Sequence, residues 1–420
     1  MVDAGKKTTY LSLVVLAVVF VLIAVRQIGR FRLRIWQIML GGAVAVLVTG
    51  QITPYEAFSA INFDVILFLF GMLVAGEALQ RSGYLESIAH QVFSGTESGK
   101  ALVFLVIMLM GLLSAVLMND TVAIIGTPLV LSFAARYRIS PGILLLALCL
   151  SVTTGSVMSP IGNPQNFLIA NYSGLENPFL TFFIGLGIPT LISLGLVYLV
   201  LFLFYRQEIS ESRRQDAPVK PLLNPELSRL ARISLVIIFL AIGLRIIGGA
   251  GLIPFSLPLM LIALGAAAPI LLFSSDRGSI LKSIDWATLV FFLALFVLMQ
   301  SVFLTGFFQS ILSCHHAMPV SLIIGLGVIV SQFISNVPFV ALFQPLILEN
   351  AISVPQVLAL AAGSTIAGNL TVMGAASNVI VIQNAEKAGY SISFWEFLKV
   401  GAPLTALQAL VYILVLGIIG

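Results

Sequence analysis

The stretch SVMSPIGNPQN, from Ser156 to Asn166, and the stretch GNLTVMGAASN, from Gly368 to Asn378, decide the fold. Both follow the pattern small-x-x-Ser/Thr-x-x-Gly-x-x-x-Asn, and both lie in the middle of a long apolar segment. Glycine, proline and polar side chains interrupt a helix, and backbone groups left unsatisfied inside a bilayer are costly. Such a break persists only where protein or a water-filled cavity satisfies it. The two stretches therefore predict two broken membrane helices, one in each half of the chain, at a functional site.

The composition of the whole chain places it in a bilayer. Of its 420 residues, 59% are hydrophobic and only 9% are charged, whereas a soluble protein has about 25% charged residues. Apolar runs close to the roughly 20 residues that cross a hydrocarbon core recur along the entire sequence. We therefore expect a multi-pass protein of the plasma membrane, surrounded by the lipid bilayer, with no separate soluble domain.

The charge pattern and the cysteine and histidine content exclude several other functions. The net charge of +4 arises from Lys and Arg in short loops, where they report topology, so we expect no nucleic-acid partner. Cys149 and Cys314 show no CxxC or zinc-like spacing, and His315 and His316 fall in a loop. We expect no metal site and no cofactor. An enzyme is not expected either, because no span holds a nucleophile with its base or an HExxH motif.

Ten apolar segments are predicted to span the membrane, five in each half. Those of the first half cover residues 10–25, 35–50, 63–80, 142–171 and 178–204. Those of the second half cover residues 233–249, 255–273, 285–305, 356–385 and 395–419. The predicted domains are a first repeat at 1–204, a cytoplasmic linker at 205–232 and a second repeat at 233–420.

Each half also holds an apolar stretch, 101–133 or 319–348, that is too long for one helix and is interrupted midway by polar residues. We interpret these stretches as re-entrant helical hairpins. The alternative is two ordinary spans joined by a tight turn. Arms of roughly 12 to 18 residues favour the hairpin, because they barely reach the length of a span.

One choice of orientation fixes the side of every loop. If the loop that holds Arg30 is cytoplasmic, all but three of the 21 Lys and Arg residues fall inside, as the positive-inside rule expects. The three outside are Lys6, Lys7 and Arg245. Both termini are then external, and five spans per half give the halves opposite orientations. The predicted fold class is an all-α membrane protein of two inverted repeats. Each repeat has five transmembrane helices, a re-entrant hairpin and a broken helix.

The predicted hairpins also match each other in sequence. Asn119 is followed by Pro128 at the same spacing as Asn336 is followed by Pro345. Together with the two broken-helix stretches, this match in the same order along both halves supports an internal repeat.

Four polar breaks, at two hairpin tips and two broken helices, are predicted to meet near the middle of the membrane. In inverted-repeat transporters, half-helix N-termini face an anionic substrate and freed carbonyls face the coupling cation. The residues expected to bind substrate are Asn119, Thr121, Ser335, Asn336, Thr371, Ser377 and Asn378. The residues expected to bind the coupling ion are Asn119, Asp120, Ser159, Gly162, Asn163, Pro164, Asn166 and Gly374. The alternative is that these residues only hold helices together, as is common in membrane bundles.

Asp120 is the only acid at a hairpin tip, and its repeat partner is Val337. A charge at the bilayer centre costs roughly 2.5–3.5 kcal/mol, so such an acid is rarely without a function. We expect Asp120 to bind the coupling ion, H+ or Na+, and the cation to bind chiefly in the first half. The alternative is an acid that stays solvated or caps the following helix. Two other acids, Asp64 and Asp285, are predicted to be helix N-caps.

These motifs resemble those of the Ion Transporter superfamily, most closely its ArsB/NhaD-like anion permease branch. That branch includes arsenite permeases, citrate transporter-like proteins and YbiR-type transporters. The resemblance covers nearly the whole chain and rests on SPIGNPQNFLIA (159–170), SQFISNVP (331–338) and NAEKAGYSISFWEFLKVGAP (384–403). It implies secondary active transport by alternating access and a homodimer. For an arsenite-type member, it also implies an ATPase subunit as a partner.

The resemblance carries over to individual positions only in part. In dicarboxylate members of the superfamily, Ser-Asn-Thr motifs at the hairpin tips bind carboxylate and sodium. In those members a Gly-x-Pro-x-Asn-like loop completes each cation site. The positions of this chain that match the tip motifs and the first of these loops are Asn119, Ser335, Asn336, Gly162, Pro164 and Asn166. Met118 and Val337 replace a motif Ser and Thr, and Asp120 takes a hydroxyl position. The hydroxyl pairs that would hold a dicarboxylate are therefore incomplete.

The expected function is ion-coupled transport of a small anion or oxyanion, with arsenite as the specific candidate. Within the superfamily, sodium/proton antiport and sodium-coupled di- or tricarboxylate symport are the alternatives. From other classes, an intramembrane enzyme lacks its catalytic groups, and a channel would not require a coupling acid.

Overall fold

The structure is a computed structural model of the chain, and it describes all but a few short segments. The described residues are 10–25, 27–28, 31–32, 34–93, 95–214, 224–250, 252, 257–307, 318–348 and 353–419. Cys314, His315, His316 and residues 215–223 of the predicted linker lie outside them. The described part is almost entirely helical, and its strands are the short antiparallel pair β1 (Gln27–Ile28) and β2 (Phe31–Arg32).

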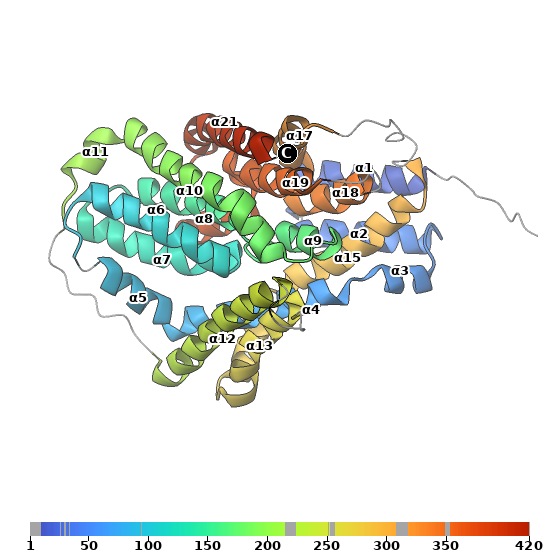
Figure 1. The fold of residues 1–420 in the computed structure, drawn as a ribbon, viewed down its shortest axis with the longest axis horizontal. Coiled ribbons are helices and arrows are strands. Elements are labelled where there is room, and N and C mark those ends of the chain that lie inside the picture. Colours follow the sequence, from blue (N-terminus) through green and yellow to red (C-terminus); the bar gives the residue numbers. More distant parts are fainter. Residues whose placement is uncertain are drawn as a thin grey trace, which may run out of the picture.

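The helices of the first half run from α1 to α10 (Figure 1). Their bounds are α1 (Leu11–Val25), α2 (Ile35–Val48), α3 (Pro54–Ala60), α4 (Phe63–Ser82), α5 (Tyr84–Phe93), α6 (Gly99–Val116), α7 (Asn119–Tyr137), α8 (Pro141–Gly155), the 3-10 turn η1 (Ser156–Met158), α9 (Pro164–Tyr172) and α10 (Pro178–Phe204). The predicted hairpin thus consists of α6 and α7, and the predicted broken helix consists of α8, η1 and α9.

The second half repeats this order after the short helix α11 (Arg206–Glu211). Its elements are α12 (Pro225–Gly249), α13 (Leu259–Phe273), α14 (Arg277–Ser283), α15 (Trp286–Phe303), α17 (Val320–Ile334), α18 (Asn336–Leu348), α19 (Val354–Ile366), η2 (Ala367–Asn369), η3 (Val372–Gly374), α20 (Ala376–Lys387) and α21 (Phe394–Ile419). Here α17 and α18 form the hairpin, and α19 to α20 form the broken helix.

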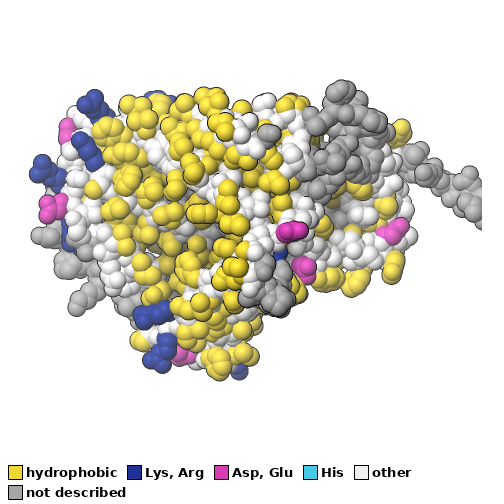
Figure 2. Space-filling model, viewed as in Figure 1, with side chains coloured by type: hydrophobic (Ala, Val, Ile, Leu, Met, Phe, Trp, Pro, Cys, Tyr) yellow, Lys and Arg dark blue, Asp and Glu magenta, His cyan; other side chains and the backbone are white. Residues whose placement is uncertain are grey.

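Seven of the described helices are long and apolar enough to cross a membrane, and four shorter apolar helices accompany them. Large apolar side chains stay exposed on them, for example Phe183, Ile184 and Ile188 on α10. Figure 2 shows hydrophobic side chains across the middle of one face, with Lys and Arg toward its edges. This is the surface expected of a protein surrounded by lipid.

The predicted boundary between the linker and the second repeat differs from the structure. The linker was predicted at 205–232, but α11 forms within it and α12 already begins at Pro225. The reason is local, because Asn224 accepts a hydrogen bond from the Leu227 amide at 3.1 Å and so caps a helix that starts with proline. The first helix of the second repeat therefore extends past the apolar segment into charged sequence.

Of the two predicted N-caps, one is confirmed and one is wrong. Asp285 accepts a hydrogen bond from the Thr288 amide at 3.2 Å and caps α15. The N-cap of α4 is Asn62, whose Oδ1 accepts from the Val65 amide at 3.0 Å, and Asp64 lies in the first turn. Asp64 still complements the positive end of the helix dipole there.

The contacts between helices show the internal repeat. In the first half α6 packs on α8, and in the second half α17 packs on α19. Across the halves, α4 packs on α13 as α15 packs on α2, and α7 packs on α20 as α18 packs on α9. The last helices of the two halves, α10 and α21, pack on each other. These contacts therefore form pairs related by exchange of the halves, as expected of two inverted repeats.

Glycines allow the hairpins to approach the broken helices closely. A Cβ atom at Gly155 of α8 would overlap the backbone of Gly111 on α6. In the second half, a Cβ atom at Gly327 of α17 would lie 2.8 Å from the carbonyl carbon of Gly363 on α19. Such contacts between small residues are how membrane helices pack without a hydrophobic driving force.

Candidate functional site

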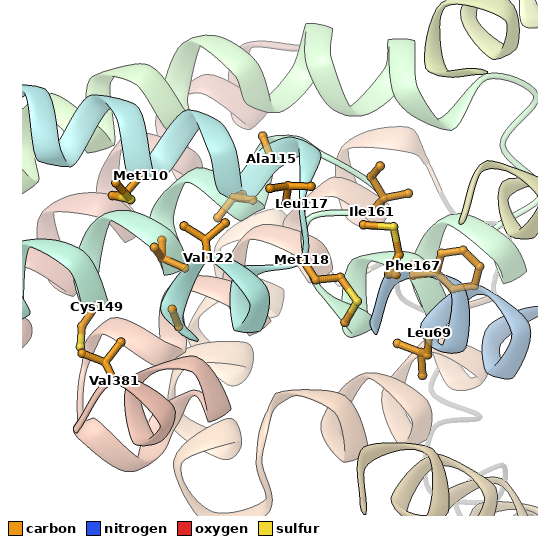
Figure 3. Packing of buried hydrophobic residues seen from close by; sticks show 14 of the residues in the cluster. Leu69, Met110, Ala115, Leu117, Met118, Val122, Cys149, Ile161, Phe167 and Val381 are labelled. Atoms are coloured by element: carbon orange, nitrogen blue, oxygen red, sulfur yellow. The ribbon is translucent and has the colours of Figure 1, made fainter. Parts of the chain in front are cut away.

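The tip of the first hairpin is joined directly to the first broken helix. The chain turns between Val116 and Asn119, and the Asn119 amide donates a hydrogen bond to the Gly162 carbonyl at 2.8 Å. Asn119 also accepts a hydrogen bond at Oδ1 from the Asp120 amide, at 2.9 Å. Figure 3 shows the turn residues Leu117 and Met118 near Ile161 of this loop. Two of the four predicted breaks therefore meet, at a hydrogen bond between predicted site residues.

Two asparagines fix the shape of the first loop, which is the break between η1 and α9. Asn163 caps α9 by accepting from the Asn166 amide at 2.8 Å, and Pro164 begins the helix. Asn166 donates from Nδ2 to the carbonyls of Ser156, Val157 and Ser159, at 3.1, 3.1 and 3.0 Å. Both asparagines are fully buried. Their amides replace the hydrogen bonds that the broken helix gives up, so these two side chains shape the loop.

The second loop uses its motif asparagine in the same way. Asn378 donates from Nδ2 to the Gly368 carbonyl at 2.6 Å, ten residues before it, as Asn166 does to Ser156. This equivalence confirms the alignment of the two stretches that defined the repeat. Both asparagines are fully buried, where backbone carbonyls need a hydrogen-bond partner.

Two threonines that the sequence analysis did not select link the halves. Thr153 donates to Oδ1 of Asn378 at 3.5 Å, and Thr365 donates to Oδ1 of Asn166 at 3.3 Å. Each threonine lies the same number of residues before the motif asparagine of its own half and bonds to that of the other half. That shared spacing was the available signal, but only the fold shows that the bonds cross between halves.

A second polar cluster, which was not predicted from the sequence, joins the second loop to α8 and α21. Asn369 donates to Thr154 and to Gln408, and Gln408 donates to Thr154, all at 2.9 Å. The three side chains are fully buried and come from η2, α8 and α21. They fasten the second loop to the first half and to the last helix.

Thr371 and Gly374 lie with Gln332 of α17. Gln332 donates from Nε2 to the Ala367 carbonyl at 2.7 Å, and Thr371 donates to Oε1 of Gln332 at 2.9 Å. Within the described part of the chain, no hydrogen bond joins Thr371 or Gly374 to the first hairpin. Gly374 was predicted to bind the coupling ion, and a Cβ atom at this position would meet Ala367, Gly368 and Gln332.

The tip of the second hairpin holds a strained residue and an unsatisfied polar atom, and a second unsatisfied atom lies on α20 of the second broken helix. Ser335 has φ +71° and ψ 157°, a conformation nearly confined to glycine. Oδ1 of the buried Asn336 and Oγ of the buried Ser377 have no hydrogen-bond partner among the described residues. Buried polar atoms without partners are uncommon, and they are expected where a ligand supplies the missing interaction.

Asp120 and Thr121 follow the tip of the first hairpin on α7. Asp120 is partly exposed, and no described Lys, Arg or His forms an ion pair with it. Thr121 is buried against Gly76 of α4, where a Cβ atom would lie 2.6 Å from the threonine Oγ1. Residues 101–135, 139–205 and 318–386, which hold both hairpins and both broken helices except for their ends, contain no Lys or Arg, and Lys100, Arg136 and Lys387 lie at the ends of α6, α7 and α20. The site therefore offers amides, hydroxyls, carbonyls and one carboxyl.

Known proteins are similar to this chain over nearly its whole length. The citrate transporter family (CitMHS) matches residues 17–363. An uncharacterized transporter of Mycobacterium bovis is 29% identical over 94% of this chain and 96% of its own. The silicon efflux transporter LSI3 of Oryza sativa subsp. japonica is 26% identical over 90% of this chain and 91% of its own.

A solved structure has the same fold. The YdaH transporter of Alcanivorax borkumensis superposes with a TM-score of 0.55 at 17% identity and covers 98% of this chain and 97% of that chain. This agrees with the resemblance to the Ion Transporter superfamily, and the relatives are transporters and not enzymes. Because the family match covers most of the sequence, the chain belongs to the citrate transporter family and is a secondary transporter.

Proposed function

We propose that this protein transports a small oxyacid or oxyanion, with arsenite as the first candidate, by ion-coupled alternating access. The observation that carries the proposal is the chemistry of the two hairpin tips. They present the amides of Asn119 and Asn336 and the carboxyl of Asp120, and residues 101–135, 139–205 and 318–386, which include both tips and both helix breaks, contain no Lys or Arg. Amides and hydroxyls can replace the water around a small hydroxylated solute, because they both donate and accept hydrogen bonds.

The relatives support a substrate of this kind. The rice relative is a silicon efflux transporter, at 26% identity over 90% of this chain. A solute rich in hydroxyl groups would be recognised by the same donors and acceptors that the two tips present. The unsatisfied Oδ1 of Asn336 and Oγ of Ser377 supply acceptors for such hydroxyl groups.

Asp120 is the proposed binding site of the coupling ion, H+ or Na+. A carboxyl in this part of the bilayer is costly when charged, and binding a cation or a proton removes that cost. Asn119 precedes it in the chain, and the bond from the Asn119 amide to the Gly162 carbonyl joins the loop of the first broken helix to the tip that carries Asp120. Loading of this site would change the charge of the hairpin tip during each transport cycle.

Citrate is the second candidate, because the matching family is described as citrate transporters. It carries several negative charges at neutral pH, and no Lys or Arg within residues 101–135, 139–205 and 318–386 would offset them. A cation bound at Asp120 would have to neutralise both the carboxyl and part of the substrate. We therefore consider a smaller solute of lower charge the better candidate substrate.

Uptake into proteoliposomes tests the proposal. Arsenite, phosphate, sulfate, citrate and succinate are offered separately, each under a proton gradient alone and under a sodium gradient alone. We expect gradient-dependent accumulation of arsenite in preference to citrate. Accumulation of citrate or succinate alone would replace the proposed substrate. Flux of any of them that never exceeds equilibration, with either gradient, would instead indicate a channel.

A further inference from the structure

Both the nitrogen and the oxygen of the Gln332 carboxamide, on α17, form hydrogen bonds with the second broken helix. Its Nε2 donates to the Ala367 carbonyl at 2.7 Å, and its Oε1 accepts from the Thr371 hydroxyl at 2.9 Å. Nε2 also donates to the Val328 carbonyl of its own helix at 3.0 Å. The side chain lies against Gly374, where a Cβ atom would be 3.2 Å from Oε1. The second loop is therefore bonded to a hairpin side chain at two of its atoms.

The first hairpin has no such side chain at the matching position. Pairing Asn336 with Asn119 aligns Gln332 with Ala115, whose methyl group cannot form hydrogen bonds. Pairing the two broken-helix stretches aligns Ala367 with Gly155 and Thr371 with Ser159. In the first loop the Ser159 hydroxyl accepts from the Ile161 amide at 3.3 Å and has no bond to the hairpin.

The carbonyl and the hydroxyl that Gln332 engages are the kind of atoms that bind a cation at a helix break. Freed carbonyls and hydroxyl oxygens coordinate Na+ in broken-helix transporters because they replace its hydration shell. An amide N–H carries partial positive charge and donates to the same carbonyl lone pair that a cation would use. A carbonyl and a hydroxyl satisfied by Gln332 are therefore less available to an ion.

We propose that the Gln332 carboxamide takes the place of a cation in the second repeat, so that only the first repeat binds a coupling ion. The inference rests on the proposed function, because it assumes ion-coupled transport. It agrees with the other difference between the tips, where Asp120 of the first repeat is replaced by Val337 in the second. The pseudo-symmetric fold thus contains a second cation position that the chain itself fills.

Sodium binding to the purified full-length protein tests this directly. Bound radioactive sodium is counted per chain at saturation for the wild type, Gln332→Ala and Gln332→Glu. The alanine variant copies Ala115, and the glutamate variant keeps the length and the acceptor for Thr371 while removing the N–H donors. We expect each variant to bind one sodium ion more than the wild type. The control is Gln344→Ala. It removes an amide that donates to Ile169 of α9 and to Ser173 directly after this helix, and it should leave the number of bound sodium ions unchanged.

The result separates this inference from the proposed function. The increase is measured against the wild type, so it is defined whether the first site takes a proton or a sodium ion. Two sodium ions on the wild type, or folded Gln332 variants with an unchanged count, would overturn the inference. Folding is checked by size-exclusion profile and melting temperature. If the alanine variant fails these checks, the glutamate variant decides. Loss of the proposed function would appear elsewhere, as wild-type uptake that depends on neither gradient.

Discussion

Asp120 lies at the tip of the first hairpin, and the matching residue of the second repeat is Val337. It follows an asparagine whose amide is bonded to the first broken helix, and no described basic residue pairs with it. A fold of two similar repeats does not require an acid at one tip only. The carboxyl is therefore best explained by chemistry that the protein carries out at that tip.

Replacing Asp120 by asparagine removes the carboxyl and keeps its shape. We expect gradient-driven uptake to fall about tenfold or more, since a charge-assisted contact of roughly 1.5–3 kcal/mol is lost. The measurement is initial uptake of arsenite by proteoliposomes under a proton or a sodium gradient. The matched control is Asp64→Asn, an exposed acid in the first turn of α4, which should keep wild-type uptake. Equal uptake by both variants would remove Asp120 from the coupling site.

Asn166 illustrates a residue whose role depends on the fold around it. It was predicted to bind the coupling ion. In the structure its Nδ2 donates to three loop carbonyls and its Oδ1 accepts from Thr365. Its replacement by alanine leaves buried carbonyls unsatisfied, at roughly 1–3 kcal/mol each. We expect a drop of several degrees in the melting temperature of the detergent-purified protein. Asn384→Ala, near the end of α20, serves as the control and should melt like the wild type.

At the scale of elements, the hairpins and broken helices were predicted from apolar length and polar interruption alone. The structure ends and restarts helices at these interruptions, at Asn119, Pro164 and Asn336. The short helices α3, α5 and α14 were not predicted, because short helices between spans have no apolar run to mark them. The start of α12 was predicted too late, because the cap at Asn224 begins the helix before the hydrophobic segment does.

The glycine contact between α6 and α8 gives a prediction at this scale. Gly155→Ala would force a methyl group into the Gly111 backbone, and we expect it to cost about 1–3 kcal/mol of stability as overpacking. Gly195→Ala on α10 meets nothing within 4 Å, and we expect it to be neutral or slightly stabilising, because alanine favours helices. Melting temperatures of the two variants provide the comparison. A Gly155 variant as stable as the Gly195 variant would show that α6 and α8 do not pack this closely.

At the scale of the whole molecule, the two halves are bound together by reciprocal contacts. The hydrogen bond from Thr153 to Asn378 has its counterpart from Thr365 to Asn166. Each broken helix thus depends on the other half for one bond at its motif asparagine. The second loop is fastened further by the cluster of Thr154, Asn369 and Gln408, so the two repeats form one polar centre.

The orientation of this molecule in the membrane is a prediction of the charge pattern, and single cysteines can test it. In a variant without Cys149 and Cys314, Glu176→Cys lies between α9 and α10 and is predicted outside, and Glu211→Cys in α11 is predicted inside. Both positions are exposed. A membrane-impermeant maleimide should label the first in intact cells and the second only after permeabilisation. The reverse pattern would invert the orientation, and labelling of both in intact cells would contradict the span count.

The sequence by itself determined the class of protein, the order of spans and the positions of the four breaks. It could do so because transfer into lipid depends on the apolar content of a segment, and polar interruptions in such a segment are locally visible. Only the tertiary structure decided which polar groups meet. Asn163 and Asn166 form hydrogen bonds within the first loop. Thr153 and Thr365 form hydrogen bonds between the halves, and Gln332 donates to a carbonyl of the second broken helix. Hydrogen bonds between residues distant in the sequence depend on how the helices pack, and no local pattern of residues specifies that packing.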